Sequence, residues 1–380
     1  MIIPHVRPWG GPPADLHLDG ARIAAVTPSA AAGPAPLALP GFVEGHCHLD
    51  KTLWGRPWWP NAIGPEREDR IRNEQAMRGP LGLDPFREGL ALCEAHLRAG
   101  TTRLRSHVDV DGESRLRHVE ALLRLREHLA GRLEIQLVAF PQDGILRTPG
   151  AREWLEEALR LGCDAVGGMD PSVVDRDPVR HLDAVFALAE RHGRPVDIHL
   201  HEPGELGAFA LELVAERTRA LGLAGRVVVS HAFALGDVPP ARAEALLALL
   251  AEAGVALCST AAPSRPVPPL RRARALGVTL FAGNDNIRDM WAPYGQPDMR
   301  ERARLMGLKH ELRRDEEVAW ALATVTTEAA RGCGFGAYGL EPGARADIVL
   351  LDAATLAEAV VSPRAPLRVV SHGREVQTSW

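Results

Sequence analysis

The most regular feature of the sequence is an alternation between short apolar runs and longer amphipathic segments. Eight apolar runs are typical of buried strands, and five of the segments between them repeat apolar residues at helical spacing. The runs end near His48, Val110, Phe140, Gly167, His201, His231, Cys258 and Gly283. The helices that this spacing predicts are residues 114–129, 151–161, 182–191, 206–221 and 240–253.

This alternation favours an α/β fold in which crossover helices connect parallel strands. Eight such units over roughly 250 residues fit a closed, TIM-like (β/α)₈ barrel. An open, doubly wound sheet is the alternative, and it normally has a glycine-rich phosphate-binding turn after its first strand. Residues 45–48 read Gly-His-Cys-His instead, so the closed barrel is favoured.

The two ends of the chain have a different, strand-rich pattern. Residues 16–26 predict a hairpin around an Asp-Gly turn, residues 346–352 a short strand and residues 367–376 a second hairpin. Strands from both ends are therefore expected to form one small sheet. The expected domains are a β-sandwich of residues 1–40 with 339–380 and a catalytic barrel of residues 41–338.

Histidines cluster where the predicted barrel strands end. His46 and His48 are two residues apart on extended chain, so both imidazoles point to the same side, and His199 and His201 repeat this arrangement. Two imidazoles on one side are able to hold a divalent metal. A pair of hydrogen-bonded structural histidines is the simpler alternative for each motif.

The topology brings further polar residues to the same place. The sixth predicted strand ends at His231, and Asp285 follows the eighth. Strands one, five, six and eight of a barrel meet at its carboxyl-terminal mouth, where active sites lie. Several imidazoles and a carboxylate converging there predict an open metal site, in which the metal lowers the pKa of a bound water.

Seven segments, in order along the chain, resemble the amidohydrolase superfamily, and in particular its cytosine deaminase and N-isopropylammelide amidohydrolase branch. The segments are 41–52 (GFVEGHCHLDKT), 106–111 (SHVDVD), 138–146 (VAFPQDGIL), 167–172 (GGMDPS), 199–204 (HLHEPG), 230–232 (SHA) and 284–295 (NDNIRDMWAPYG). Residues 346–352 (ADIVLLD) are similar to the strand that closes the β domain of such enzymes.

The resemblance implies one divalent metal, zinc or iron, and a set of catalytic groups. The implied metal ligands are His46, His48, His199 and Asp285. Asp285 would also take a proton from the metal-bound water, His231 would orient that water, and Glu202 would carry a proton to the ring nitrogen and the leaving amine. An exposed glutamate before a helix is the simpler alternative for Glu202.

Five residues are implied to contact a small heterocyclic substrate: Lys51, Gln142, His201, Asn286 and Trp291. Lys51, His201 and Asn286 are like the isopropylammelide enzyme, whereas Gln142 and Glu202 are like cytosine deaminase. A contact between Lys51 and a ring carbonyl is one hypothesis. A salt bridge between Lys51 and a neighbouring carboxylate is the other.

The function expected from this mixture is hydrolytic deamination of a cytosine-like or related amino-heterocycle, with metal-bound hydroxide attacking the amine-bearing carbon and ammonia leaving. The alternatives are removal of an alkylamine from an s-triazine-like ring, deamination of a pterin or isocytosine, and, remotely, a non-catalytic binding barrel. Base deaminases with a Cys-X-X-Cys zinc motif are excluded, because no such motif occurs here.

Composition and charge limit the partners and the cellular location that are expected for the protein. A net charge of −5 gives no basic surface for nucleic acid, and the longest apolar run is too short for a membrane span. Five cysteines without short spacings predict free thiols and a cytoplasmic location. The sequence is compatible with a homo-oligomer and does not determine the oligomeric state.

Several residues near these motifs are expected to have lesser roles. The tryptophan-rich stretch 53–80 is expected to be an irregular loop, either a lid or a subunit contact. His107 is expected to be a hydrogen-bond partner of the metal ligands or a core residue. Four other histidines are expected on polar helix faces: His96, His118, His128 and His192.

Overall fold

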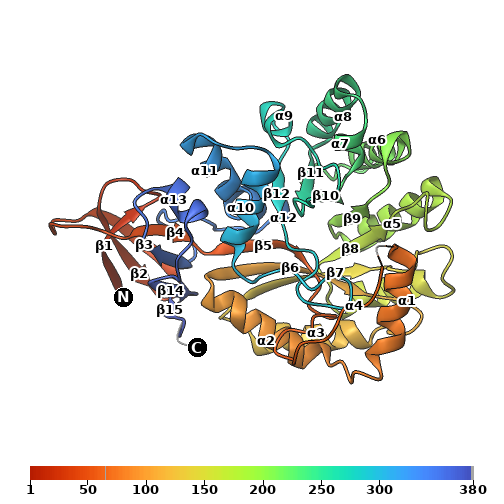
Figure 1. Cartoon of the computed structure of the whole chain (residues 1–380), viewed down its shortest axis with the longest axis horizontal. Coiled ribbons are helices and arrows are strands. Elements are labelled where there is room, and N and C mark those ends of the chain that lie inside the picture. The colour runs from red at the N-terminus through yellow and green to blue at the C-terminus, as the bar shows by residue number, and fades with distance from the viewer. Residues whose placement is uncertain (65, 378–380) are drawn as a thin grey trace.

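A parallel eight-stranded barrel forms the larger part of the chain, and the computed structural model describes residues 1–64 and 66–377 (Figure 1). Neighbouring strands pair in chain order from β5 to β12, and a parallel bridge between Cys47 and Asp285 brings the last strand back to the first. The strands are β5 (Phe42–Cys47), β6 (Thr101–Asp109), β7 (Glu134–Phe140), β8 (Ala165–Met169), β9 (Val196–Leu200), β10 (Val227–His231), β11 (Val255–Ser259) and β12 (Leu280–Ala282). The predicted TIM-like barrel is confirmed.

Helices surround the barrel strands, and most of them cover its outside. They are α1 (Arg67–Arg78), α2 (Pro85–Arg98), α3 (Arg117–His128), α4 (Ala151–Leu161), α5 (Pro178–His192), α6 (Gly204–Ala220), α7 (Ala234–Asp237), α8 (Pro240–Ala253), α9 (Leu270–Ala275), α10 (Met299–Lys309), α11 (Asp315–Ala323), α12 (Thr327–Cys333) and α13 (Leu356–Val361). Local sequence sets many of their limits. Asp84 and Asp177 cap α2 and α5 with their side chains, and Gly193 and Gly254 end α5 and α8 in the left-handed conformation.

Strands from the N-terminal and C-terminal parts of the chain form a second sheet beside the barrel (Figure 1). Its order is β15-β14-β13-β4-β1-β2-β3. The strands are β1 (Ile2–Pro8), β2 (Ala14–Asp19), β3 (Arg22–Pro28), β4 (Leu37–Pro40), β13 (Ile348–Leu351), β14 (Arg368–Ser371) and β15 (Arg374–Glu375). The separate domain built from both termini is confirmed. Its exact limits stay a prediction, and residues 378–380 of that prediction lie outside the described part.

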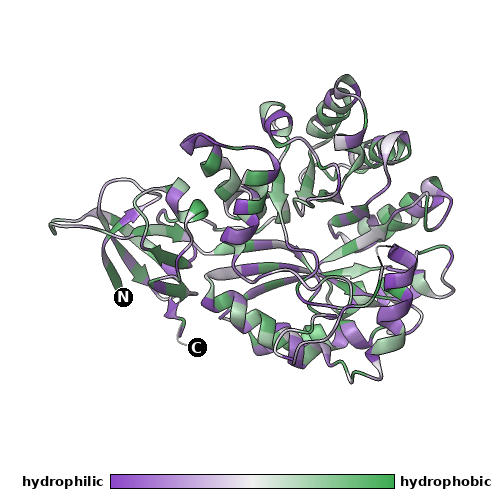
Figure 2. Ribbon diagram, viewed as in Figure 1, coloured by the Kyte–Doolittle hydropathy of each residue, from purple (hydrophilic) through white to green (hydrophobic). Residues whose placement is uncertain are grey.

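The stretch 53–80 is not wholly an irregular loop, because α1 occupies its second half; residue 65 lies outside the described part. The helix is largely hydrophilic (Figure 2), so it lacks the apolar repeat from which a helix is predicted. Its buried residues are charged: Glu74 and Arg78. The first half of the stretch, up to residue 64, has no regular element.

Two histidines expected on polar faces are in fact buried. His96 of α2 is fully buried and lies 3.0 Å from the carbonyl oxygen of Pro297, and His118 of α3 lies 3.0 Å from Asp50 Oδ2. These partners belong to segments distant in sequence, which a helical pattern alone does not reveal. Among residues 1–64 and 66–377, no helix has both the length and the apolar character that crossing a membrane requires.

Candidate active site

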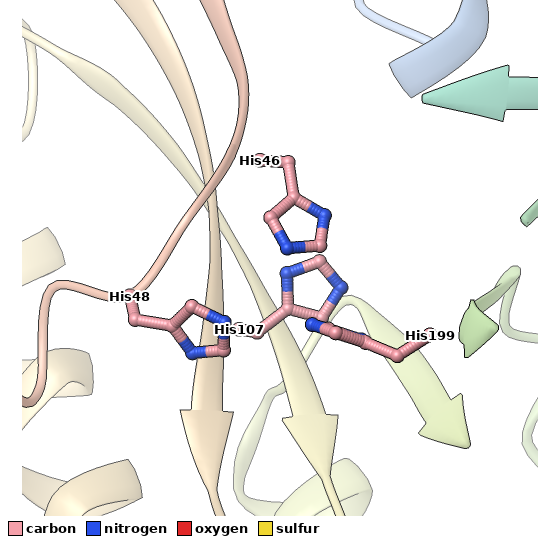
Figure 3. Close-up of side chains that lie close together, drawn as sticks. All are labelled: His46, His48, His107 and His199. Atoms are coloured by element: carbon pink, nitrogen blue, oxygen red, sulfur yellow. The ribbon is translucent and has the colours of Figure 1, made fainter. Parts of the chain in front are cut away.

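Four imidazoles converge inside the mouth of the barrel (Figure 3). His46 lies on β5, His48 directly after it, His107 on β6 and His199 on β9. The ring centroids of His46 are 4.1 Å from those of His107 and 4.6 Å from those of His199, and His107 and His199 are 4.5 Å apart. The side chains that the two His-X-His motifs place on one face therefore meet in space.

Asp285, which follows β12, and His231 at the end of β10 complete this cluster. Asp285 Oδ1 lies 3.5 Å from His46 Nε2 and 3.2 Å from His48 Nε2. The ring of His231 is 5.2 Å from those of His46 and His199. Asp285 and His231 have φ angles of 64° and 70°, a region that non-glycine residues rarely adopt and that is concentrated at functional sites.

The donor set of this cluster fits a divalent metal ion. His46 Nε2, His231 Nε2 and both ring nitrogens of His199 are buried without a hydrogen-bond partner among the described residues. Burial lowers the pKa of His199 and of His231 well below the usual value, which keeps both imidazoles neutral. Neutral imidazoles with one carboxylate, Asp285, are ligands that zinc and iron both accept.

Hydrogen bonds behind the cluster fix the orientation of His46. The Ser230 hydroxyl donates to Asp197 Oδ1 at 2.8 Å and lies 2.9 Å from His46 Nδ1. Because its only proton is used on Asp197, the hydroxyl accepts from Nδ1–H, so His46 Nε2 presents a lone pair to the cluster. Arg105 donates to the other oxygen of Asp197 at 2.9 Å.

His107 lies closer to the centre than the sequence indicated. Its Nε2 is 3.4 Å from Asp197 Oδ1, and its ligand atom falls in one group with those of His46, His48 and His199. Burial lowers the pKa of His107 to about 3. The geometry admits His107 as a further ligand as well as a hydrogen-bond partner. Its position near the end of the second barrel strand was the available signal.

Glu202 is buried and held from one side only. Its Oε1 accepts hydrogen bonds from the backbone N–H groups of Ser172 at 2.6 Å and Val173 at 2.8 Å. Its Oε2 is buried without a partner in the described part of the chain, and burial raises the pKa of this carboxyl group. The exposed-residue alternative is therefore wrong, and burial makes the protonated form of this carboxyl group easier to reach than in an exposed glutamate.

All five predicted substrate-contacting residues line one cavity, together with three of the predicted metal ligands. The lining residues are His48, Lys51, Phe140, Gln142, Met169, His199, His201, Asp285, Asn286 and Trp291. Glu202 and His231 are not among these lining residues. The structure thus brings the predicted substrate-contacting residues and three of the predicted metal ligands to one cavity.

Lys51 is a fully buried cation in the wall of this cavity. Its Nζ lies 2.9 Å from Asp109 Oδ2 and 3.4 Å from Glu74 Oε2, and it donates to Gln142 Oε1 at 2.6 Å. Burial alone would lower the pKa of Lys51, but the two carboxylates raise it above the usual value. The hypothesis of a salt bridge between Lys51 and a neighbouring carboxylate is confirmed. Lys51 also lines the cavity, and its contact with a ring carbonyl stays a prediction.

Two further carboxylates orient pocket residues. Asp170 Oδ2 lies 2.9 Å from His201 Nδ1 and also pairs with Arg67 of α1. Asn286 Nδ2 donates to Asp289 Oδ2 at 2.5 Å, which leaves the Asn286 carbonyl oxygen for a hydrogen-bond donor. Burial raises the pKa of Asp289 to about 7.

The sequence reasoning gave no role to four carboxylates of this region: Glu74, Asp109, Asp170 and Asp289. Three of them lie within the segments that carry the family resemblance or directly beside a barrel strand, which was a usable signal. Glu74 lies on α1, where a glutamate and an arginine four residues apart were the only hint.

A (β/α)₈ barrel with histidines and an aspartate at the carboxyl ends of its strands defines a class of metal-dependent hydrolases. The chain belongs to the amidohydrolase family, because the model of that family matches residues 95–377. It is therefore an enzyme of a family whose members hydrolyse carbon–nitrogen bonds, and the family depends on metal.

Three relatives are similar over nearly the whole chain. A structure of N-isopropylammelide isopropylaminohydrolase from Burkholderia multivorans has a TM-score of 0.95 at 50% identity and covers 99% of this chain and 97% of its own. 5-Methylcytosine deaminase from Klebsiella pneumoniae, liganded with 5-fluorocytosine, has a TM-score of 0.89 at 28% identity and covers 100% and 98%. N-isopropylammelide isopropyl amidohydrolase from Pseudomonas sp. (strain ADP) is 30% identical and covers 89% and 85%. These relatives act on small heterocycles.

Proposed function

We propose that this enzyme hydrolyses the exocyclic carbon–nitrogen bond of an oxygenated, s-triazine-like ring and releases an alkylamine. The relative at 50% identity is an isopropylaminohydrolase, and this similarity is the observation that carries the proposal. The buried Lys51 beside Gln142, and the pair of His201 with Asp170, agree with a pocket for a ring with several carbonyl groups.

His46, His48, His199 and Asp285 would hold one divalent ion, zinc or iron, which supplies a hydroxide nucleophile near neutral pH when it is bound. The three histidines lie in one possible ligand group, and Asp285 lies in an overlapping group with His46 and His199. Asp285 lies against His46 and His48, so its carboxylate is placed to take a proton at Oδ1 from the attacking water. His231 would orient that water through its Nε2, which has no hydrogen-bond partner in the described part of the chain. His107 lies in the same histidine group, so its imidazole is placed to serve as a further ligand of the ion.

Proton delivery to the leaving amine needs a group that is protonated near neutral pH. Glu202 is the candidate for this group, because burial shifts its pKa upward and its Oε2 carries no other hydrogen bond among the described residues. The proton on Oε2 would pass to the ring nitrogen or amine as the carbon–nitrogen bond breaks. Gln142 and Asn286 would hold the ring by its carbonyl and N–H groups.

Release of ammonia from an aminopyrimidine is the second candidate. It is favoured by the similarity to 5-methylcytosine deaminase over the whole chain. The attacked carbon and the proton transfers are the same in both reactions, and only the leaving group and the ring differ.

The test compares two triazines that differ only in the leaving group with two aminopyrimidines that both release ammonia. The purified enzyme is incubated with N-isopropylamino-dihydroxytriazine, amino-dihydroxytriazine, cytosine and 5-methylcytosine, and ammonia and isopropylamine are both quantified. We expect the highest kcat/KM for the N-isopropyl ring, with one metal ion per chain by elemental analysis. Exclusive turnover of the pyrimidines would replace the proposal with the second candidate, and no turnover with well under one metal per chain would contradict both.

A further inference from the structure

Helix α1 carries a carboxylate with no exposure to solvent, although the helix itself is mostly hydrophilic. Glu74 lies one turn before Arg78, and the guanidinium donates to Glu74 Oε1 from Nη2 at 2.5 Å and from Nε at 3.1 Å. Charged side chains are rarely buried completely unless they are paired. The other carboxylate oxygen of Glu74, Oε2, therefore also needs polar partners in order to be buried.

Those partners belong to the substrate pocket. Glu74 Oε2 accepts a hydrogen bond from the indole Nε1–H of Trp291, and it lies 3.4 Å from Lys51 Nζ. Lys51 and Trp291 come from opposite ends of the barrel sequence, after β5 and after β12, and both line the cavity. The Lys51 ammonium also lies 5.3 Å from the centre of the Trp291 ring. The Glu74 carboxylate thus contacts two pocket residues that come from segments distant in sequence.

The contact with Lys51 extends to Gln142. The ammonium donates to Gln142 Oε1 at 2.6 Å, and Gln142 Nε2 is buried without a partner among the described residues. An ammonium group only donates, so the amide cannot flip without placing its NH₂ against a cation. Gln142 is therefore locked with its two N–H donors free for a substrate acceptor, such as a ring carbonyl oxygen.

We infer that Glu74 is a positioning residue, which fixes the donor orientation of Gln142 through Lys51 and the ring of Trp291 directly, so that the pocket selects a ring with a carbonyl on that side. This inference rests on the proposed function for its substrate. Asp109 Oδ2 accepts from Arg78 Nη2 at 2.6 Å and pairs with Lys51, so a second carboxylate shares both cations. Among the described residues, the indole N–H of Trp291 donates to Glu74 and not to Asp109.

The first test is Glu74→Gln, with Asp69→Asn as the matched control. Asp69 is an exposed acid on the same helix whose ion pair is with Arg72. Loss of a charge-assisted contact is expected to raise KM for the carbonyl-bearing substrate about 10- to 100-fold, while kcat changes less than about threefold. The control keeps wild-type values. A folded Glu74→Gln enzyme with wild-type KM would overturn the inference.

A double-mutant cycle separates positioning from simple structural support. Because part of the effect of Glu74 passes through Lys51, Glu74→Gln is expected to lower kcat/KM by a smaller factor in a Lys51→Met background than in the wild type, and the remaining loss comes from its direct contact with Trp291. If the fold-losses in kcat/KM of the two single variants multiplied fully in the double variant, the result would contradict the inference. If Glu74→Gln does not fold, Glu74→Asp keeps the charge, shortens the reach, and is expected to raise KM in the same direction by a smaller factor.

The last readout does not depend on turnover. In a spectrum of the eight ¹⁵N-labelled tryptophan indoles, the Trp291 resonance is identified from its loss in Trp291→Phe. It is expected downfield in the wild type, shifted upfield in Glu74→Gln and unmoved in Asp69→Asn. An unmoved resonance in Glu74→Gln would contradict the inference even with an inactive wild type. Absence of wild-type turnover with the expected shift would count against the proposed function alone.

Discussion

Individual residues of this site have chemical tasks set by what each atom contacts. Two backbone N–H groups occupy one oxygen of Glu202, while the other oxygen is buried without a partner in the described chain. A carboxyl group in this setting is anchored but still able to exchange a proton. Lys51 is the opposite case, because carboxylates on two sides keep it charged and fixed.

Glu202→Gln tests the proton-carrying role at this scale. The amide has nearly the same shape and its oxygen still accepts from Ser172 and Val173, but it cannot carry a transferable proton. We expect kcat to fall by about 10²- to 10⁴-fold with an unchanged metal content. The control is Glu205→Gln, an exposed residue three positions later that pairs with Arg242. A Glu202→Gln enzyme with wild-type kcat would remove Glu202 from the mechanism.

At the scale of elements, the barrel strands could be predicted from the sequence because their apolar runs end abruptly in polar residues. The order of these strands then brings His46, His199 and Asp285 to one mouth without any knowledge of distances. Helices with an apolar stripe were equally accessible: α4 and α8 have the predicted limits.

What could not be predicted depends on contacts between elements. Helix α1 attaches to the barrel through buried ion pairs of Glu74 and Arg78, so it has no apolar stripe to detect. The partner of His201 is Asp170, which comes from the loop after a different strand. Burial of His96 follows from the segment before α10 lying over α2. Such contacts need the assembled fold.

The burial of His96 between two elements predicts an acid-sensitive fold. Burial lowers the pKa of His96 to about 4, below the usual value of about 6.5. Between these values the unfolded chain binds a proton that the native state does not, so the free energy of unfolding falls as the pH drops from about 6.5 to about 4. The full effect is on the order of 3 kcal/mol.

The variant His96→Gln retains a donor for the carbonyl of Pro297 but does not titrate. Its denaturation midpoint, measured in urea from pH 7 to pH 4.5, is therefore expected to depend less steeply on pH than that of the wild type. Its stability at pH 7 is compared separately, because the substitution also changes packing. Parallel pH profiles for the two proteins would contradict this prediction.

At the scale of the whole molecule, the candidate metal centre lies where the barrel closes. β12 is only three residues long, and the closure between the first and last strands includes a single bridge from Cys47 to Asp285. The predicted ligands come from β5, β9 and the residue stretch after β12. A metal ion bound to them would therefore join the two ends of the barrel sheet as well as serve the chemistry.

Metal removal is consequently expected to destabilise the entire barrel. Ligand binding to the native state alone adds about 2.7 kcal/mol when the free metal exceeds its Kd 100-fold. Chelated protein, verified as metal-free by elemental analysis, should melt several degrees lower, and zinc or ferrous iron should restore its Tm. Amide hydrogen exchange should increase first in β12 and the adjoining part of β5, where the closure is weakest.

In Asp285→Ala the melting temperature should respond much less to added metal, because one ligand and the closing carboxylate are both lost. An unchanged Tm after complete metal removal from the wild type would show that packing alone closes the barrel.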